Sequence, residues 1–157
     1  IAVRAFEKLP DKKLYVAGNG PMMEEMQRCV REHHMENVKF LGYLQKDEMS
    51  EKFYQAKAVI MTSQCYEAFA MTIAEAYSYG VPVIAGRVGN MDGMVQDGIT
   101  GVKFTYNSAE DLADKISAFD AMDLSVLKKN ARAFYAERLR PEDNYQKLIR
   151  IYEDISK

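Results

Sequence analysis

Two glutamates bracket a stretch whose residue types could bind an anionic ligand. Glu67 and Glu75 lie on either side of a short loop that leads into a predicted helix beginning near Met71. The free backbone N–H groups at the start of a helix attract anions, and nearby carboxylates can accept hydrogen bonds from sugar hydroxyls. The alternative is that Glu67 is a solvated loop residue and Glu75 a helix-surface residue, with Thr72 serving as a cap.

The same stretch continues through a tight turn into a predicted buried strand. Gly80 is expected to end the helix in a left-handed conformation, and Pro82 lies just beyond it. Residues 83–85 are a short apolar run, typical of a strand that is covered on both faces. Loop, helix, turn and strand together form the unit around which we expect the fold to be built.

The rest of the chain alternates predicted strands with predicted helices. Strands are expected at 14–17, 38–41, 58–62, 82–86 and 102–104, and helices at 1–9, 22–34, 46–55, from 108 onward, and at about 123–138 and 142–155. Residues 89–93 are expected to be irregular. Repeated β–α units with short connections predict an α/β fold, in which a parallel sheet carries helices on both faces.

Several loops should meet at one edge of this sheet. Ligands of such folds bind beyond the carboxyl ends of the strands. The turn with Gly18 and Gly20, the residue Gly42, and the loops 63–69 and 86–89 all fall at that edge. The topology therefore predicts a binding site there, although the glycine turn after the first strand could equally be turn chemistry alone.

Composition sets the outer limits. The 157 residues are 48% apolar and 28% charged, which is typical of one globular domain with a real core. A formal net charge of −2 provides no basic field, so a nucleic-acid partner is not expected. Cys29 and Cys65 have neither metal-ligand nor redox spacing, so a reducing cytoplasm is the expected location. The opening segment looks helical and has no start Met, which suggests a piece of a longer protein.

Motifs along nearly the whole chain carry a family resemblance. They are Gly-Asn-Gly-Pro at 18–21, Val-Lys-Phe-Leu-Gly-Tyr at 38–43, the Glu-x7-Glu stretch within 63–75, Gly-Val-Pro-Val-Ile-Ala at 80–85, and Asp-Gly-Ile-Thr-Gly at 97–101. In this order they resemble the C-terminal, donor-binding domain of retaining glycosyltransferases of group 1 (family 4 type). Those enzymes have the GT-B architecture of two facing Rossmann-like domains. The resemblance implies that residues 1–157 are a single Rossmann-like donor domain, and that the acceptor-binding domain lies outside this chain.

The resemblance also implies roles for individual residues. The donor would be a nucleoside-diphosphate sugar, with Glu75 accepting hydrogen bonds from the ribose and Glu67 lying beside the anomeric carbon. The diphosphate would meet the start of the helix, at Phe69, Ala70, Met71 and Thr72. The base would meet the glycine turns, which assigns further donor contacts to Gly42, Gly18 and Gly20. The family generally uses no bound metal, so neither a metal nor another cofactor is expected. An acceptor glycan, lipid or small molecule would be held by the missing domain, and the full-length protein could then lie at the inner membrane surface.

The chain departs from the family pattern at several positions. Ala68 and Ala70 stand where the family usually has glycine, and the Gly-Gly-x-x-Glu loop of the family becomes Gly-Asn-Met-Asp-Gly at 89–93, with Asp92 preceding the usual Glu position. The Arg and Lys that neutralise the diphosphate in the family precede residue 1. We therefore expect the 157-residue chain alone to have no transferase activity. Two alternatives remain: a non-catalytic nucleotide-sugar binding module, and half of a nucleotide-sugar epimerase.

Overall fold

The computed structural model describes residues 1–64, 66 and 68–156. In chain order its elements are α1 (Ala2–Glu7), β1 (Leu14–Ala17), α2 (Met23–Glu32), β2 (Val38–Gly42), α3 (Lys46–Gln55), β3 (Val59–Met61), α4 (Met71–Ser78), β4 (Val83–Gly86), α5 (Gly89–Met94), β5 (Gly101–Phe104), α6 (Ala109–Phe119), α7 (Leu124–Arg138) and α8 (Pro141–Ile155). The alternation of strands and helices predicted from the sequence is confirmed.

All strand pairs in the described residues are parallel. β1 pairs with β2, and β4 lies between β3 and β5. The backbone hydrogen bonds thus form two ladders, β1–β2 and β3–β4–β5, within the part of the chain that the structure describes. Parallel strands need crossover connections, and α2, α3, α4, α5 and α6 lie in the connections between or after them.

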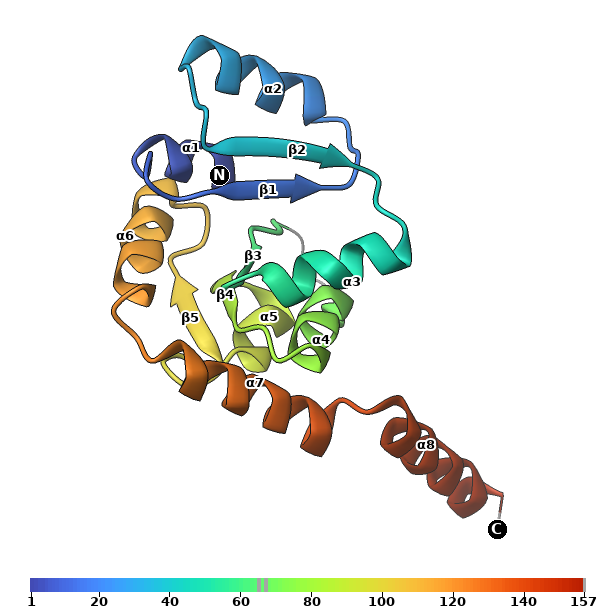
Figure 1. Ribbon diagram of the computed structural model, residues 1–157. Coiled ribbons are helices and arrows are strands. Elements are labelled where there is room, and N and C mark those ends of the chain that lie inside the picture. Colours follow the sequence, from blue (N-terminus) through green and yellow to red (C-terminus); the bar gives the residue numbers. More distant parts are fainter. Residues whose placement is uncertain (65, 67, 157) are drawn as a thin grey trace.

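Helices cover both faces of the sheet, because β4 sends alternate side chains to two separate cores. Ile84 belongs to a core with residues of α1, β1, β2, β5 and α6, whereas Val83 and Ala85 belong to a second core with residues of α3, α4 and α5. Figure 1 shows α1 and α6 packed side by side, and α2 lying along β2. This arrangement confirms the predicted Rossmann-like α/β class.

α4 is amphipathic and carries the predicted donor residues on its outer side. Its inward residues Ile73, Ala74, Ala76 and Tyr77 are buried, whereas Thr72 and Glu75 are exposed. Gly80 has a φ of +68°, which confirms the left-handed end predicted for this helix. The core face thus fixes the rotation of α4, and the rotation places Thr72 and Glu75 in solvent.

A buried hydroxyl network anchors α4 to the turn before β5. The hydroxyl groups of Tyr77 and Thr100 are 2.7 Å apart, and Thr100 Oγ1 also accepts a hydrogen bond from the backbone N–H of Gln96 at 3.0 Å. Burial raises the pKa of Tyr77 to about 12, although its hydrogen bond with Thr100 acts in the opposite direction. Buried hydroxyl groups need hydrogen-bond partners, and here the hydroxyls of Tyr77 and Thr100 bond to each other.

Gly101 lies where β5 passes very close to β4. A Cβ atom at this position would collide with the carbonyl group of Val83, the residue that pairs with Gly101 across the ladder. Glycine is therefore required here by space, because its lack of a side chain allows the two backbones to approach.

The segment after β4 differs from the prediction. Residues 89–93 were expected to be irregular, but Gly89–Met94 form the six-residue helix α5. The helix forms because Met91 and Met94, three positions apart and therefore on one face, are both buried in the second core. Burial of these side chains outweighs the low helix propensity of the glycines.

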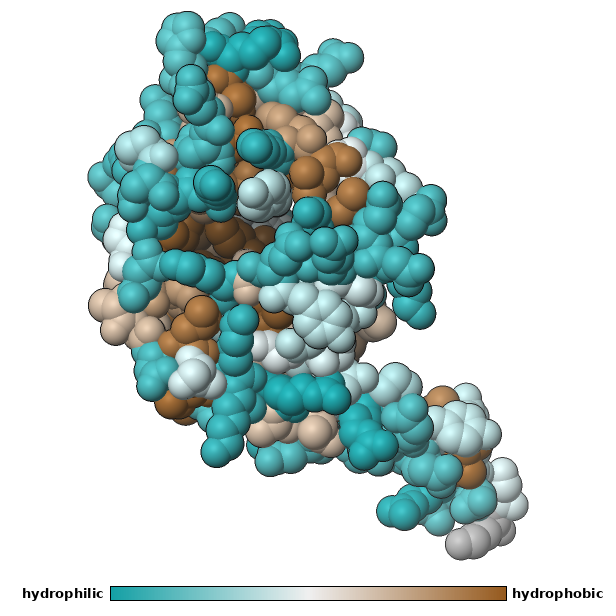
Figure 2. All heavy atoms as spheres, in the orientation of Figure 1, coloured by the Kyte–Doolittle hydropathy of each residue, from teal (hydrophilic) through white to brown (hydrophobic). Residues whose placement is uncertain are grey.

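α8 projects from the body of the molecule, as Figure 1 shows. None of its described residues is buried, and its apolar side chains are exposed at helical spacing, namely Tyr145, Leu148, Ile151, Tyr152 and Ile155. Figure 2 shows apolar atoms uncovered on this helix. Within the described residues, no helix has both the length and the apolar character needed to cross a membrane.

Candidate functional site

The start of α4 is open to solvent. Ala70 caps the helix with φ −83° and ψ 85°, and its methyl group is fully buried, while Phe69 and Met71 on either side are 49% and 60% exposed. Ala70 has a negative φ, so alanine fits at this position, where the resembling family has glycine. The backbone N–H of Thr72 has no acceptor among the described residues. The helix therefore presents an unused donor beside the Thr72 hydroxyl.

Glu75 lies on the same side of α4 as Thr72, three positions further along. Residues three apart are neighbours on a helix surface. The Glu75 side chain is exposed, and no described residue contacts its carboxylate by a hydrogen bond or an ion pair. An open helix start and a carboxylate without a partner among the described residues thus lie within about one turn of each other. Glu67 lies outside the described residues, so its role stays a prediction.

The loops after β1 and β2 meet directly. The N–H of Gly18 donates to the carbonyl of Gly42 at 2.6 Å, and both residues have positive φ, +106° and +68°. No heavy atom lies within 4 Å of where a Cβ would stand at Gly18 or Gly20. The structure thus brings Gly18 and Gly42 together and leaves space for a ligand to approach the backbone at Gly18 and Gly20. The bonds of the described residues do not join this pair directly to the start of α4.

Side chains from α5 and from the loop after β5 contact the loop that precedes α4. The side-chain amide of Asn90 donates to the Ala68 carbonyl. The Gln64 amide donates to Asn107 Oδ1 at 3.0 Å, and the Tyr106 hydroxyl donates to the Gln64 carbonyl at 3.3 Å. Sequence reasoning missed these contacts. One available signal was that Tyr106 and Asn107 follow β5 at the ligand-binding edge of a parallel sheet.

Asp92, next to the position where the family has Glu, is held by cations. Its Oδ1 lies 2.9 Å from Lys103 Nζ and 3.8 Å from Arg87, which also contacts Asp97 at 2.8 Å. Asp92 Oδ1 is shielded from solvent. The Asp92 carboxylate therefore serves to fasten α5 to β5, and the two neighbouring positive charges neutralise it.

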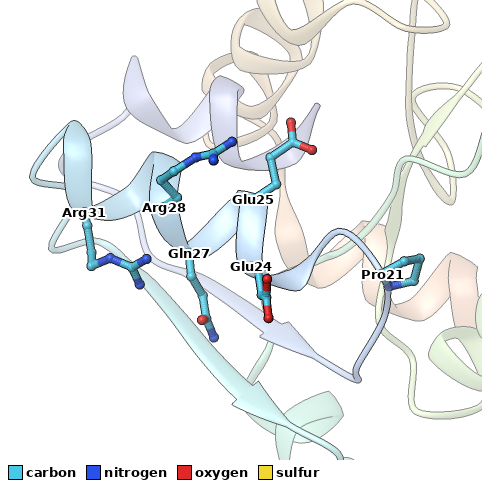
Figure 3. A pocket seen from close by; sticks show the side chains of 6 residues that line it. All are labelled: Pro21, Glu24, Glu25, Gln27, Arg28 and Arg31. Atoms are coloured by element: carbon cyan, nitrogen blue, oxygen red, sulfur yellow. The ribbon is translucent and has the colours of Figure 1, made fainter.

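A surface hollow on α2 is lined by charged side chains, but they do not converge on a common point as they would in a binding site. It is lined by Pro21, Glu24, Glu25, Gln27, Arg28 and Arg31. Figure 3 shows that these side chains do not converge, since Glu25 points to one side of α2 and Glu24 to the other. Opposite charges four positions apart, such as Glu24 and Arg28, are typical of a solvated helix face. In the described part of the chain, no three His, Cys, Asp or Glu residues are placed to hold a metal ion.

Comparison with known proteins shows which family this chain resembles. The family model of glycosyl transferases group 1 matches residues 1–133. The N-acetyl-alpha-D-glucosaminyl L-malate synthase of Bacillus anthracis is 29% identical over 98% of this chain and 40% of its own. The sulfoquinovosyl transferase of Arabidopsis thaliana is 30% identical over 80% of this chain and 25% of its own.

Solved structures share the fold over almost the whole chain. The crystal structure of a glycosyltransferase from Rickettsia africae superposes with a TM-score of 0.88 at 23% identity, over 99% of this chain and 44% of that protein. This chain therefore spans less than half the length of the proteins that it matches. Because the family model covers most of the sequence, the chain belongs to the group 1 glycosyl transferases.

Proposed function

We propose that this chain is the donor-binding half of a glycosyltransferase that transfers a sugar from a nucleoside-diphosphate sugar to an acceptor. The observation that carries the proposal is the open start of α4, where the N–H of Thr72 has no acceptor among the described residues and the exposed side chains of Thr72 and Glu75 share one face of the helix. Membership of the group 1 glycosyl transferases supports it. The acceptor, a glycan, a lipid or a small molecule, would be bound by a domain outside residues 1–157.

The diphosphate would lie at the start of α4. The helix dipole and the N–H of Thr72 favour negative charge there, and the Thr72 hydroxyl can donate a further hydrogen bond. The Met71 N–H, which the sequence also assigned to the diphosphate, donates instead to the Phe69 carbonyl at 3.1 Å. These donors would stabilise the charge that develops on the diphosphate as the sugar departs. Catalysis by this half would therefore be electrostatic.

The nucleoside would be recognised by a carboxylate and by backbone. Glu75 would accept hydrogen bonds from the ribose hydroxyls, and such charge-assisted bonds are stronger than neutral ones. Gly42 would line the base pocket, and Gly18 and Gly20 would allow the backbone to approach the ligand. Glu67 would lie beside the sugar, near the positive charge that develops at the anomeric carbon.

The proposed transfer proceeds with retention and without an enzyme nucleophile or a metal. The bond between the anomeric carbon and the diphosphate oxygen breaks, and its electron pair leaves with the diphosphate. The acceptor oxygen then bonds to the same face of the sugar. Its proton passes to the leaving phosphate oxygen, so charge and atoms balance.

Nucleotide titration followed by NMR tests the donor site. UDP is the first probe, because a protein of the same fold, Anabaena HepE, was crystallised with UDP (TM-score 0.88, 22% identity, 98% of this chain and 44% of that one); GDP, ADP and UDP-glucose follow. Shifts should cluster at Gly42, at residues 69–72 and at Glu75. Glu75→Ala should weaken binding about tenfold, the value of one charge-assisted hydrogen bond. Glu153→Ala on the distant α8 is the matched control and should change nothing.

Further measurements on the longer protein that is proposed to contain this chain separate the alternatives. Failure of both proteins to bind any nucleotide would overturn the proposal. Binding without sugar transfer to any acceptor would favour the non-catalytic module. Conversion of the nucleotide sugar without an acceptor would favour the epimerase.

A further inference from the structure

The α4 entry loop lies between β3 and the proposed phosphate site, and its described residues are 62–64, 66 and 68–70. It belongs to no helix or strand where it is described. It nevertheless decides where the N–H groups of residues 69–72 lie, because it delivers the chain to the cap residue Ala70. Ordering a loop costs about 1–2 kcal/mol per residue, and a ligand that must order it binds more weakly.

The end of the entry loop is held from the segment after β4. The Asn90 side chain, at the start of α5, donates to the Ala68 carbonyl, 22 positions away in sequence. α5 itself is fixed, because Met91 is buried and Asp92 is paired with Lys103. Asn90 and Ala68 each stand where the resembling family has glycine. The two residues that differ from the family pattern are thus joined by a hydrogen bond.

The beginning of the entry loop is held from the segment after β5. Asn107 Oδ1 accepts a hydrogen bond from the Gln64 amide, and the Tyr106 hydroxyl donates to the Gln64 carbonyl. Asn107 has a φ of +60°, a left-handed conformation that is costly for most residues and better tolerated by Asn and Asp. The residue with this costly backbone conformation is therefore the same one whose side chain contacts the entry loop.

We propose that Asn90 and Asn107 are positioning residues for the proposed donor site. They tether the entry loop at two points, Gln64 near its beginning and Ala68 near its end, and hold the start of α4 ready for the diphosphate without touching the ligand. The inference rests on the proposed function. It adds that nucleotide affinity depends on two side chains outside the binding motif.

Variants can separate positioning from fold stability. Asn107→Gly removes the acceptor for Gln64, yet glycine adopts positive φ freely, so the fold should be as stable as before or more stable. Asn107→Asp keeps both the acceptor oxygen and the tolerance of positive φ, and serves as the matched rescue. Asn90→Ala removes the donor to Ala68, and Asn90→Asp keeps the size but cannot donate when ionised.

The measurements are the Kd for UDP, the thermal midpoint and the amide hydrogen exchange of the free chain. Asn107→Gly, Asn90→Ala and Asn90→Asp should each raise the Kd about fivefold, the value of one hydrogen bond. They should speed exchange at residues 68–72 without lowering the thermal midpoint. Asn107→Asp should behave as the unmodified chain.

The outcomes distinguish this inference from the proposed function. If the unmodified chain binds UDP and the variants bind it equally well, the positioning role is wrong while the donor site stands. The role is also wrong if affinity falls only together with the thermal midpoint. If the chain and the longer protein bind no nucleotide, the proposed function fails and the inference falls with it.

Discussion

The Tyr77 hydroxyl is a buried polar group on the inner face of the helix that carries the proposed site. It faces Thr100 rather than water, so the cost of burying it is offset by a hydrogen bond. Ionisation would place a negative charge in that core. Burial therefore raises the pKa of Tyr77 from 10 to about 12.

This pKa shift predicts a pH dependence of stability. The folded-state pKa is above the unfolded value, so the contribution is fully present below pH 10 and is lost as the pH rises toward 12. A shift of this size is worth about 2 to 3 kcal/mol. In urea unfolding across that range, the free energy of unfolding should fall less steeply in Tyr77→Phe than in the unmodified chain. An equal slope in the two proteins would contradict the assignment; the exposed Tyr152→Phe is the control.

At the scale of elements, two glycines test whether α5 is a helix and whether β5 lies close to β4, because one has open space where a Cβ would stand and the other has none. Gly93 is exposed within α5 and no atom lies within 4 Å of a Cβ there, whereas a Cβ at Gly101 would meet the Val83 carbonyl. Gly93→Ala should therefore stabilise the chain by about 0.5–1 kcal/mol, the difference in helix propensity. Gly101→Ala should destabilise it by about 3 kcal/mol or more, or prevent folding.

Chemical unfolding of both variants checks this pair of effects. Equal stabilities would mean that β4 and β5 can separate without cost, which contradicts the close approach of their backbones. Destabilisation by Gly93→Ala would mean that α5 is not a helix in solution.

The sequence predicted the elements with clear periodicity and missed features that depend on distant partners. α4 and its end at Gly80 follow from local composition. The prediction that residues 89–93 are irregular is wrong, because the burial of Met91 and Met94 on one face holds them in the helix α5. The Gln64–Asn107 contact spans 43 positions between two loops, and no local pattern encodes such a pairing. The roles of Thr72 and Glu75 came from the family resemblance and remain predictions.

At the scale of the whole molecule, α8 contributes little to the core. None of its described residues is buried, and it projects from the body in Figure 1. Its apolar side chains are exposed, so they do not contribute the free energy that burial would give.

Truncation after Arg140 should therefore change the free energy of unfolding by less than about 0.5 kcal/mol, as for other surface changes. A longer truncation that also removes α7 is the comparison, because α7 buries Leu127 and Ala131 and should be required for folding. Thermal or urea unfolding measures both. A loss of stability above about 1 kcal/mol in the shorter truncation would show that α8 packs against the body in solution.

β4 belongs to both cores at once, with Ile84 on one face and Val83 and Ala85 on the other. Neither core can therefore unfold while the other stays intact, because loss of either core leaves one face of β4 without its packing partners. The chain should behave as one cooperative unit even though its apolar interior is divided in two. Damage far from the proposed donor site, for instance among the side chains of α6, would then reach α4 through the folding equilibrium rather than through any local contact.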